Sequence, residues 1–127
     1  MTDKTSEKAS IDKFDSQLMR GSLDLMILAV LDRDRQYGYS ILQELRDASA
    51  EKVDLKAGTL YPILHRLEAE KLIRSKWDES TGRKRKWYEL TKAGHKRLQQ
   101  QAQTWHAYVN CIQSLLPPSL AQPLPAT

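Results

Sequence analysis

Apolar residues recur at intervals of three and four over most of the chain, the spacing of helices that each bury one face. The pattern predicts four helices in the first part of the chain, over roughly residues 10–20, 22–31, 38–48 and 57–70. Their apolar faces are, in chain order, Ile11, Phe14 and Leu18; Leu23, Met26, Ile27, Val30 and Leu31; Ile41, Leu42, Leu45 and Ala48; and Leu60, Ile63, Leu64 and Leu67. Ser10 is the expected N-cap of the first helix, and Gly21 is expected to end it.

Pro62 complicates the fourth helix. If Thr59 is the N-cap, Pro62 takes the third helical position, where the amide has no partner in any case. If the helix begins earlier, Pro62 removes an internal hydrogen bond and should bend the helix slightly. The sequence leaves both alternatives open.

The period changes to two at Ile73, where apolar and polar residues begin to alternate. This alternation predicts a strand over residues 73–77, followed by a glycine-containing turn and a second strand over 86–90. Tyr88 and Leu90 would share one face, and Trp77 and Trp87 are expected to pack across the strands. The two strands form a hairpin that carries the basic run 83–86 near its tip.

A last, long helix follows Thr91, its expected cap. Residues spaced alternately by three and four form an apolar seam like that of a coiled coil. The seam comprises His95, Leu98, Ala102, Trp105, Val109, Ile112 and Leu116. Pro117 and Pro118 end the helix, and residues 1–9 and the Pro-rich segment 117–127 are expected to be disordered.

This order of elements predicts a mostly α-helical fold with a small β-hairpin, a winged helix-turn-helix with an added arm. The winged domain, with its N-terminal helix, would span residues 10–91, and the arm residues 92–116. The helices over 38–48 and 57–70 would be the helix-turn-helix, and the hairpin the wing. A length of 127 residues suits such a domain.

The distribution of charge along the chain indicates what kind of partner such a fold would bind. The chain has a net charge of +4, but residues 74–97 hold nine cations against three acids, so a local +6 exceeds the total. The cations are Arg74, Lys76, Arg83, Lys84, Arg85, Lys86, Lys92, Lys96 and Arg97. A basic wing suits the phosphates of double-stranded DNA, although a solvated surface is the default interpretation of any charge run.

The sequence offers no sign of a membrane, a metal site or catalysis. The polar N-terminus resembles no leader, and the longest apolar run, residues 25–31, is too short to span a bilayer, so we expect a cytoplasmic protein. Cys111 is the only cysteine, and with His106 five positions away the two do not share a helix face. We expect no cofactor, no metal and no enzymatic activity.

Four stretches together resemble the PadR family of transcriptional regulators over roughly residues 20–116. They are LDLMIL (23–28), YGY (37–39), GTLYPILHRLE (58–68) and YELTKAG (88–94). The resemblance implies a winged-helix homodimer that binds an operator and usually represses transcription, and some members release DNA on binding small aromatic or cationic compounds. The single C-terminal helix looks like that of the short subgroup. The rival hypothesis is a winged-helix protein–protein interaction module without DNA binding.

By resemblance, Thr59, Tyr61 and His65 face DNA, whereas Tyr61 is alternatively partly buried. Arg66 contacts DNA or pairs with Glu70 four residues on. The other expected DNA contacts are Lys56, Tyr37 and Tyr39 on phosphate and Arg83, Lys84 and Arg85 in the wing. The two tyrosines alternatively pack against the fourth helix, with Tyr39 the more buried, and Lys86 lies closer to the sheet.

The seam of the last helix predicts the dimer interface: Leu98, Ala102, Trp105, Val109, Ile112 and Leu116. A two-fold dimer would place two recognition helices one DNA turn apart and so read an inverted repeat. Trp105 is either simple dimer core or a flat surface for a planar ligand. In the second case Phe14 and Tyr108 would line the same space, and these three residues are the candidate effector site.

Overall fold

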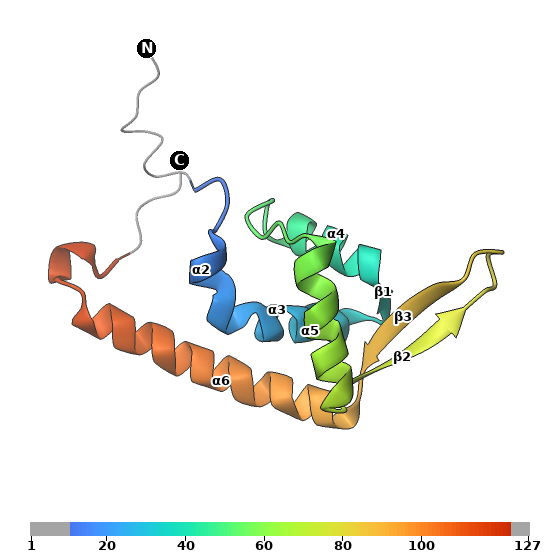
Figure 1. Cartoon of the computed structure of the whole chain (residues 1–127). Helices are drawn as coiled ribbons and strands as arrows, with labels where there is room; N and C mark the ends of the chain where they lie inside the picture. Colours follow the sequence, from blue (N-terminus) through green and yellow to red (C-terminus); the bar gives the residue numbers. More distant parts are fainter. Residues whose placement is uncertain (1–10, 123–127) are drawn as a thin grey trace, which may run out of the picture.

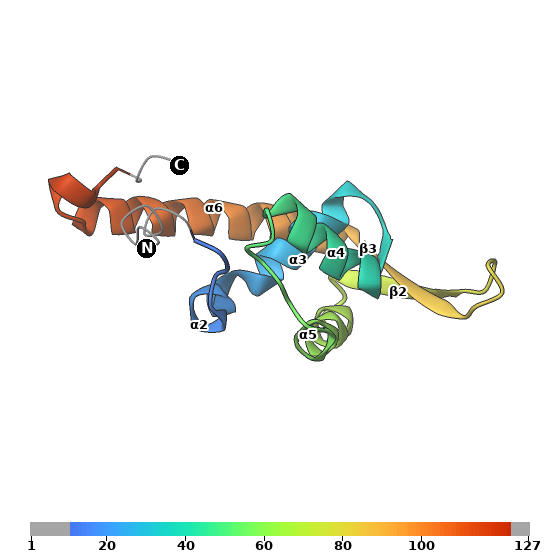
Figure 2. The same ribbon diagram turned by 90° about the horizontal axis from the view of Figure 1, so that it is seen from above.

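The structure is a computed structural model that describes residues 11–122, and Figures 1 and 2 show its shape. The long helix α6 runs away from the other helices on one side, and a hairpin projects on the other. The helices are α2 (Ser16–Met19), α3 (Leu23–Arg33), α4 (Gly38–Ala48), α5 (Ala57–Ala69) and α6 (Lys92–Leu115), with short 3₁₀ helices at Arg20–Ser22 and Pro118–Leu120. The strands are β1 (Gln36–Tyr37), β2 (Ile73–Asp78) and β3 (Arg85–Leu90). The predicted fold class, a mostly helical winged helix with a long C-terminal helix, is confirmed.

The N-terminal helix is shorter than predicted. It begins after Asp15, whose carboxylate accepts a hydrogen bond of 2.8 Å from the Leu18 amide, and residues 11–15 are not helical. The Phe14 amide donates instead to the Lys52 carbonyl at 3.0 Å, a partner that no local pattern indicates. Gly21 lies in a 3₁₀ turn that leads into α3, and Leu18 is exposed. Ser10 and residues 1–9 lie outside the described residues.

Helices α3, α4 and α5 pack around one hydrophobic core, as their periodicity predicts. Its buried residues are Met19, Ile27, Leu28, Val30, Leu31, Ile41, Leu42, Leu45, Val53, Leu55, Leu60, Leu64, Leu67, Leu72, Ile73 and Tyr88. Two positions differ from the expected faces: Ala48 is exposed and Ile63 is only half-buried. Lys56 rather than Thr59 precedes α5, so Pro62 lies inside the helix, and the alternative with an earlier start is the one the fold adopts.

The sheet has three antiparallel strands in the order β1-β3-β2, so β1 is a strand that the sequence did not reveal. Two residues are too few for an alternating pattern to be recognised. Tyr88 and Leu90 share a face, as predicted. Trp77 pairs with Lys86 and Trp87 with Lys76, so the two tryptophans lie on opposite faces of the hairpin and each packs against cations rather than against the other.

Helix α6 begins after Thr91, whose hydroxyl oxygen accepts a hydrogen bond of 3.0 Å from the Gly94 amide, as predicted for a cap. Leu98 is half-buried against the core, whereas Trp105 and Tyr108, further along the helix, are exposed. The helix ends before Pro117, and residues 118–120 form a 3₁₀ turn. Residues 123–127 of the segment expected to be disordered lie outside the described residues. Within residues 11–122, no helix combines the length and apolarity needed to cross a bilayer.

Candidate nucleic-acid interface

Helix α5 presents an open polar edge beside its buried face. Thr59 and His65 are exposed, and so is Lys56, the residue that precedes the helix. Burial of Leu60, Leu64 and Leu67 on the other side explains this orientation, because helical spacing then directs Thr59 and His65 outward. A hydroxyl and an imidazole are groups that can hydrogen-bond to base edges, and a lysine can reach a phosphate.

Tyr61 is half-buried, as the alternative to DNA contact predicts. Its hydroxyl lies so close to Gly38 that a Cβ atom at Gly38 would come within 2.3 Å of it. The side chain therefore packs α5 against the start of α4, and glycine at position 38 makes room for it. Gly38 and Tyr61 belong to two of the stretches that resemble the PadR family, but no local pattern in the sequence indicated that they touch.

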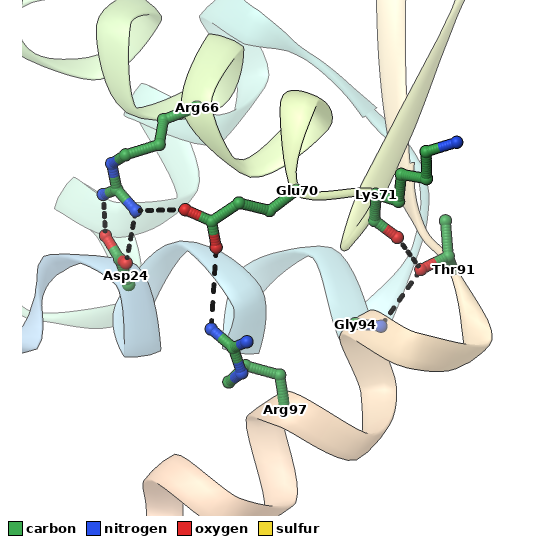
Figure 3. A network of polar contacts seen from close by, with 7 residues as sticks. All are labelled: Asp24, Arg66, Glu70, Lys71, Thr91, Gly94 and Arg97. Atoms are coloured by element: carbon green, nitrogen blue, oxygen red, sulfur yellow. Dashed lines mark hydrogen bonds and ion pairs between the residues drawn. The ribbon is translucent and has the colours of Figure 1, made fainter.

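Arg66 lies away from the exposed edge and pairs with α3 (Figure 3). Its guanidinium donates two hydrogen bonds to the Asp24 carboxylate, at 2.6 and 3.0 Å, and one to Glu70 at 3.4 Å. The hydrogen bonding of Arg66 to the Asp24 carboxylate is the main reason that the pKa of Arg66 is raised further above its usual value. Arg66 thus fits the alternative of an intramolecular ion pair, with Asp24 as a second partner that sequence spacing did not indicate.

The two tyrosines around Gly38 are buried in the opposite order to that expected. Tyr39 is 71% exposed at the start of α4, whereas Tyr37 is half-buried under Arg85, which lies 4.0 Å from its ring centre. The Tyr37 hydroxyl donates to Asp78 at 2.5 Å. This bond, with a second from the Ser80 amide, lowers the pKa of Asp78 to about 2, and the same bond raises the pKa of Tyr37.

The wing tip carries unpaired positive charge. Arg83, Lys84 and Arg85 are exposed, and among residues 11–122 none of them forms an ion pair. Gly82 turns the tip with a φ of +82°, a conformation that favours glycine. Lys86 lies on the sheet as expected, half-buried and 4.0 Å from Glu68.

Three aromatic–cation contacts at the two tryptophans of the wing were missed by the sequence pattern. Trp77 is 55% exposed, with the Lys84 ammonium 4.8 Å and the Lys86 ammonium 5.5 Å from its ring centre. Arg35 lies 4.6 Å from the ring centre of Trp87. A hollow of about 160 Å³ opens here beside the first turn of α4, which has no side-chain cap. It is lined by Arg35, Gln36, Tyr37, Ser40, Asp78 and Trp87.

A second, larger space separates α2 and α3 from α6. This interhelical groove has a volume of about 980 Å³, and Phe14, Trp105 and Tyr108, the candidate effector residues, all line it. The remaining lining residues are Gln17, Leu18, Met19, Gly21, Ser22, Leu25, Met26, Arg97, Gln100, Gln101, Thr104, Val109 and Ile112.

Of the predicted interface residues, Leu98 and Ala102 are half-buried, whereas Trp105, Ile112 and Leu116 are exposed in the single chain. Within the described residues, no group of three or more His, Cys, Asp or Glu side chains is placed to hold a metal ion.

Comparison with known proteins agrees with the geometry. Residues 27–100 match the transcriptional regulator PadR-like family. A transcriptional regulator of Mycobacterium tuberculosis is 37% identical over 82 residues, which are 65% of this chain and 74% of that protein. A solved structure of a transcriptional regulator from Clostridium thermocellum has 31% identity and a TM-score of 0.75, and the match covers 80% of this chain and 100% of that one.

A PadR family transcriptional regulator from Eggerthella lenta is similar to the same degree. Its structure has 33% identity and a TM-score of 0.73, with 80% of this chain and 88% of that chain covered. The match to the family spans more than half of the sequence and includes both helices of the helix-turn-helix and the wing. The chain therefore belongs to the PadR-like family of transcriptional regulators.

Proposed function

We propose that this regulator binds duplex DNA through the exposed edge of α5 and the wing, and that it represses transcription. The observation that carries the proposal is the pairing of two open surfaces. Thr59 and His65 offer groups that can read base edges, and the wing tip offers cations that form no ion pair within residues 11–122. Phosphate contacts from the wing supply affinity, and base contacts from α5 supply sequence choice.

Tyr39 and the hollow beside α4 extend the same surface. The first amides of α4 lack a side-chain cap, and Ser40 and Arg35 line the hollow next to them. Uncapped amides at a helix start, with a hydroxyl and a guanidinium nearby, suit a DNA phosphate. Tyr37 contributes by holding the wing base rather than through its hydroxyl, which Asp78 occupies.

The proposed active form is a homodimer. The second half of α6 leaves Trp105, Tyr108, Ile112 and Leu115 exposed in the single chain, and an apolar stripe of this length is typical of an interaction surface. A second copy related by a two-fold axis would cover it and set the recognition helices about one DNA turn apart, roughly 34–36 Å. The operator would then be an inverted repeat with half-site centres about 10 base pairs apart.

A small aromatic effector is a further part of the proposal. The interhelical groove is mostly apolar and is lined by Phe14, Trp105 and Tyr108. A planar compound could stack there and shift the position of the two recognition helices of the dimer relative to each other. Tryptophan fluorescence titrated with planar aromatic compounds tests this step. The same response in wild type and in Trp105→Ala would exclude Trp105 from sensing.

Duplex binding as a function of salt tests the main proposal. We expect affinity for the protein's own promoter region to fall linearly with salt on a double-logarithmic plot, and footprinting there to reveal an inverted repeat. An interaction module without DNA binding would show neither. A promoter–reporter fusion, with and without the regulator, then distinguishes repression from activation.

A further inference from the structure

The end of α5 and the start of α6 meet in one tightly bonded corner (Figure 3). The Thr91 hydroxyl lies 2.8 Å from the Lys71 carbonyl oxygen and accepts from the Gly94 amide, and the Thr91 amide donates to the Leu72 carbonyl at 3.1 Å. A Cβ atom at Gly94 would lie 1.9 Å from that same carbonyl oxygen. The backbone of α6 at Gly94 therefore packs directly against the backbone of Leu72, and no side chain fits between them.

Glu70 adds a side-chain link across this corner. One carboxylate oxygen pairs with Arg66 at 3.4 Å and the other with Arg97 of α6 at 3.7 Å. Arg66 is in turn held by its double hydrogen bond to Asp24 of α3. The chain of contacts Asp24–Arg66–Glu70–Arg97 thus joins three helices at the C-terminal end of the recognition helix (Figure 3).

Besides its contact with Glu70, Arg97 lines the interhelical groove. Among the described residues that line the groove, Arg97 is the only charged one. Its side chain is 41% exposed, so it can be reached from the groove while it pairs with Glu70. Arg97 therefore lies between the groove and the C-terminal end of α5.

We propose that Arg97 is a positioning residue that, through Glu70, holds the C-terminal end of α5 in a fixed orientation to α6. Its effect on operator recognition rests on the proposed DNA-binding function, but its effect on helix orientation does not. Exposed ion pairs contribute little to stability, so the contribution of Arg97 lies in the orientation that the shared Glu70 carboxylate selects.

Distances between spin labels on the two helices test the orientation directly. Ala57→Cys at the far end of α5 and Gln103→Cys on α6 are both exposed positions, and Cys111→Ser removes the native thiol. Labelled chains diluted into unlabelled Cys111→Ser protein report the distance within one chain, whether or not the protein dimerises. We expect Arg97→Gln and Glu70→Gln each to broaden or shift the distance distribution, and the double variant to add nothing further.

Arg33→Gln is the matched control, because Arg33 forms a similarly exposed ion pair with Glu44 at 2.6 Å, away from this corner. It should leave the distribution as in the wild type. Distributions for Arg97→Gln and Glu70→Gln that match this control would overturn the proposal. So would independent, additive changes in the double variant, since they would show that the two side chains do not act through one contact.

DNA binding supplies the functional readout. We expect Arg97→Gln to lower affinity for the operator by roughly five-fold or more while its affinity for unrelated duplex and its thermal midpoint stay near wild type. A merely structural role would instead lower the midpoint and weaken binding to both DNAs together, which would contradict a positioning role. If the wild type binds no DNA, the proposed function fails, and the distance measurement still decides whether Arg97 orients α5.

Discussion

At the residue scale, the wing is held to the helices by polar contacts as well as by the core. Tyr37 of β1 contacts both strands of the wing: Arg85 lies over its ring, and its hydroxyl donates a hydrogen bond to Asp78. A donor hydrogen bond stabilises the carboxylate over the carboxylic acid, which is why the pKa of Asp78 is about 2 rather than the ordinary 3.8. A carboxyl group with a pKa lower in the folded state stabilises the fold above its unfolded pKa.

Tyr37→Phe should therefore raise the pKa of Asp78 towards 3.8, with the Ser80 amide keeping it somewhat below that value. The stabilisation by this contact is present at neutral pH and is lost as the pH falls from about 4 to about 2. Wild type and variant should thus differ in stability at pH 7 and converge near pH 2. Carbon-13 NMR titration of the Asp78 carboxyl group measures the shift, and Tyr39→Phe, which removes a hydroxyl that does not bond Asp78, is the control. An unchanged midpoint in Tyr37→Phe would contradict the assignment.

The wing tip gives a second residue-scale prediction. Changing Arg83, Lys84 and Arg85 together to alanine should weaken binding to all duplexes about equally. Each lost phosphate contact should also reduce the slope of affinity against salt by roughly 0.9 on the double-logarithmic plot. Circular dichroism should be unchanged, because the three side chains are exposed and form no ion pairs within residues 11–122. An unaltered slope would leave the wing as a solvated loop.

The edge of α5 should behave differently. His65→Ala or Thr59→Ala should reduce operator binding more than binding to unrelated DNA, by about 1–3 kcal/mol if a base edge is read. Competition assays with both DNAs at one salt concentration measure the difference. Equal losses on the two DNAs would place these side chains on the phosphate backbone instead.

Helical spacing was enough to predict that Thr59 and His65 of α5 are exposed and that its three leucines are buried. Thr59 and His65 face outward because three leucines of the same helix face inward. Spacing could not assign the partner of Arg66, since Asp24 lies 42 positions earlier in the chain, nor the order of burial at Tyr37 and Tyr39, which depends on a strand of two residues. Contacts between residues distant in sequence are set by the tertiary fold, and no local pattern contains them.

At the element scale, the same distinction explains which segments were predicted well. Helices α3, α5 and α6 begin and end close to their predicted positions, because caps, prolines and charged stretches are local signals. Helix α2 is short and β1 was missed, because the first depends on the bond from Phe14 to Lys52 and the second on pairing with β3. The candidate groove could be assigned only in part: the sequence suggested Phe14, Trp105 and Tyr108, whereas Arg97 looked like one cation among nine.

The close approach of α6 to the end of α5 yields a prediction about glycine. In Gly94→Ala the new methyl group would meet the Leu72 carbonyl, a backbone atom that cannot rotate away, so α6 must shift. We expect a loss of about 1–3 kcal/mol in the free energy of unfolding, as in an overpacked core. Gly58→Ala is the control, because Gly58 also lies in the first turn of a helix but has nothing within 4 Å; it should gain about 0.5–1 kcal/mol. Urea unfolding of both variants makes the comparison, and a Gly94→Ala protein as stable as Gly58→Ala would contradict it.

At the scale of the whole molecule, the long arm is the part that a single chain explains least. Helix α6 packs on α3, and beyond Leu98 most of its large apolar side chains are exposed: Trp105, Tyr108, Ile112 and Leu115. Helix propensity alone does not stabilise so long an exposed amphipathic helix, and most helical stability in proteins comes from packing of the apolar face. A second copy of the chain, packed along this face and the interhelical groove, would cover the apolar face of α6. It would also fix the distance between the two recognition helices α5.

The double variant Val109→Glu and Ile112→Glu tests this assembly. Burying a glutamate in an apolar interface requires it to be neutral, and protonating a group of pKa near 4.3 at pH 7 costs up to about 3.7 kcal/mol. Because two such groups enter from each protomer, we expect the double variant to be monomeric at micromolar concentration by analytical ultracentrifugation, and the wild type to be dimeric. Operator affinity should fall steeply, because one reading head contacts only one half-site. Gln103→Glu, exposed and off the seam, should remain dimeric. A wild-type monomer at micromolar concentration would refute the dimer, and a dimeric double variant would move the interface away from the seam.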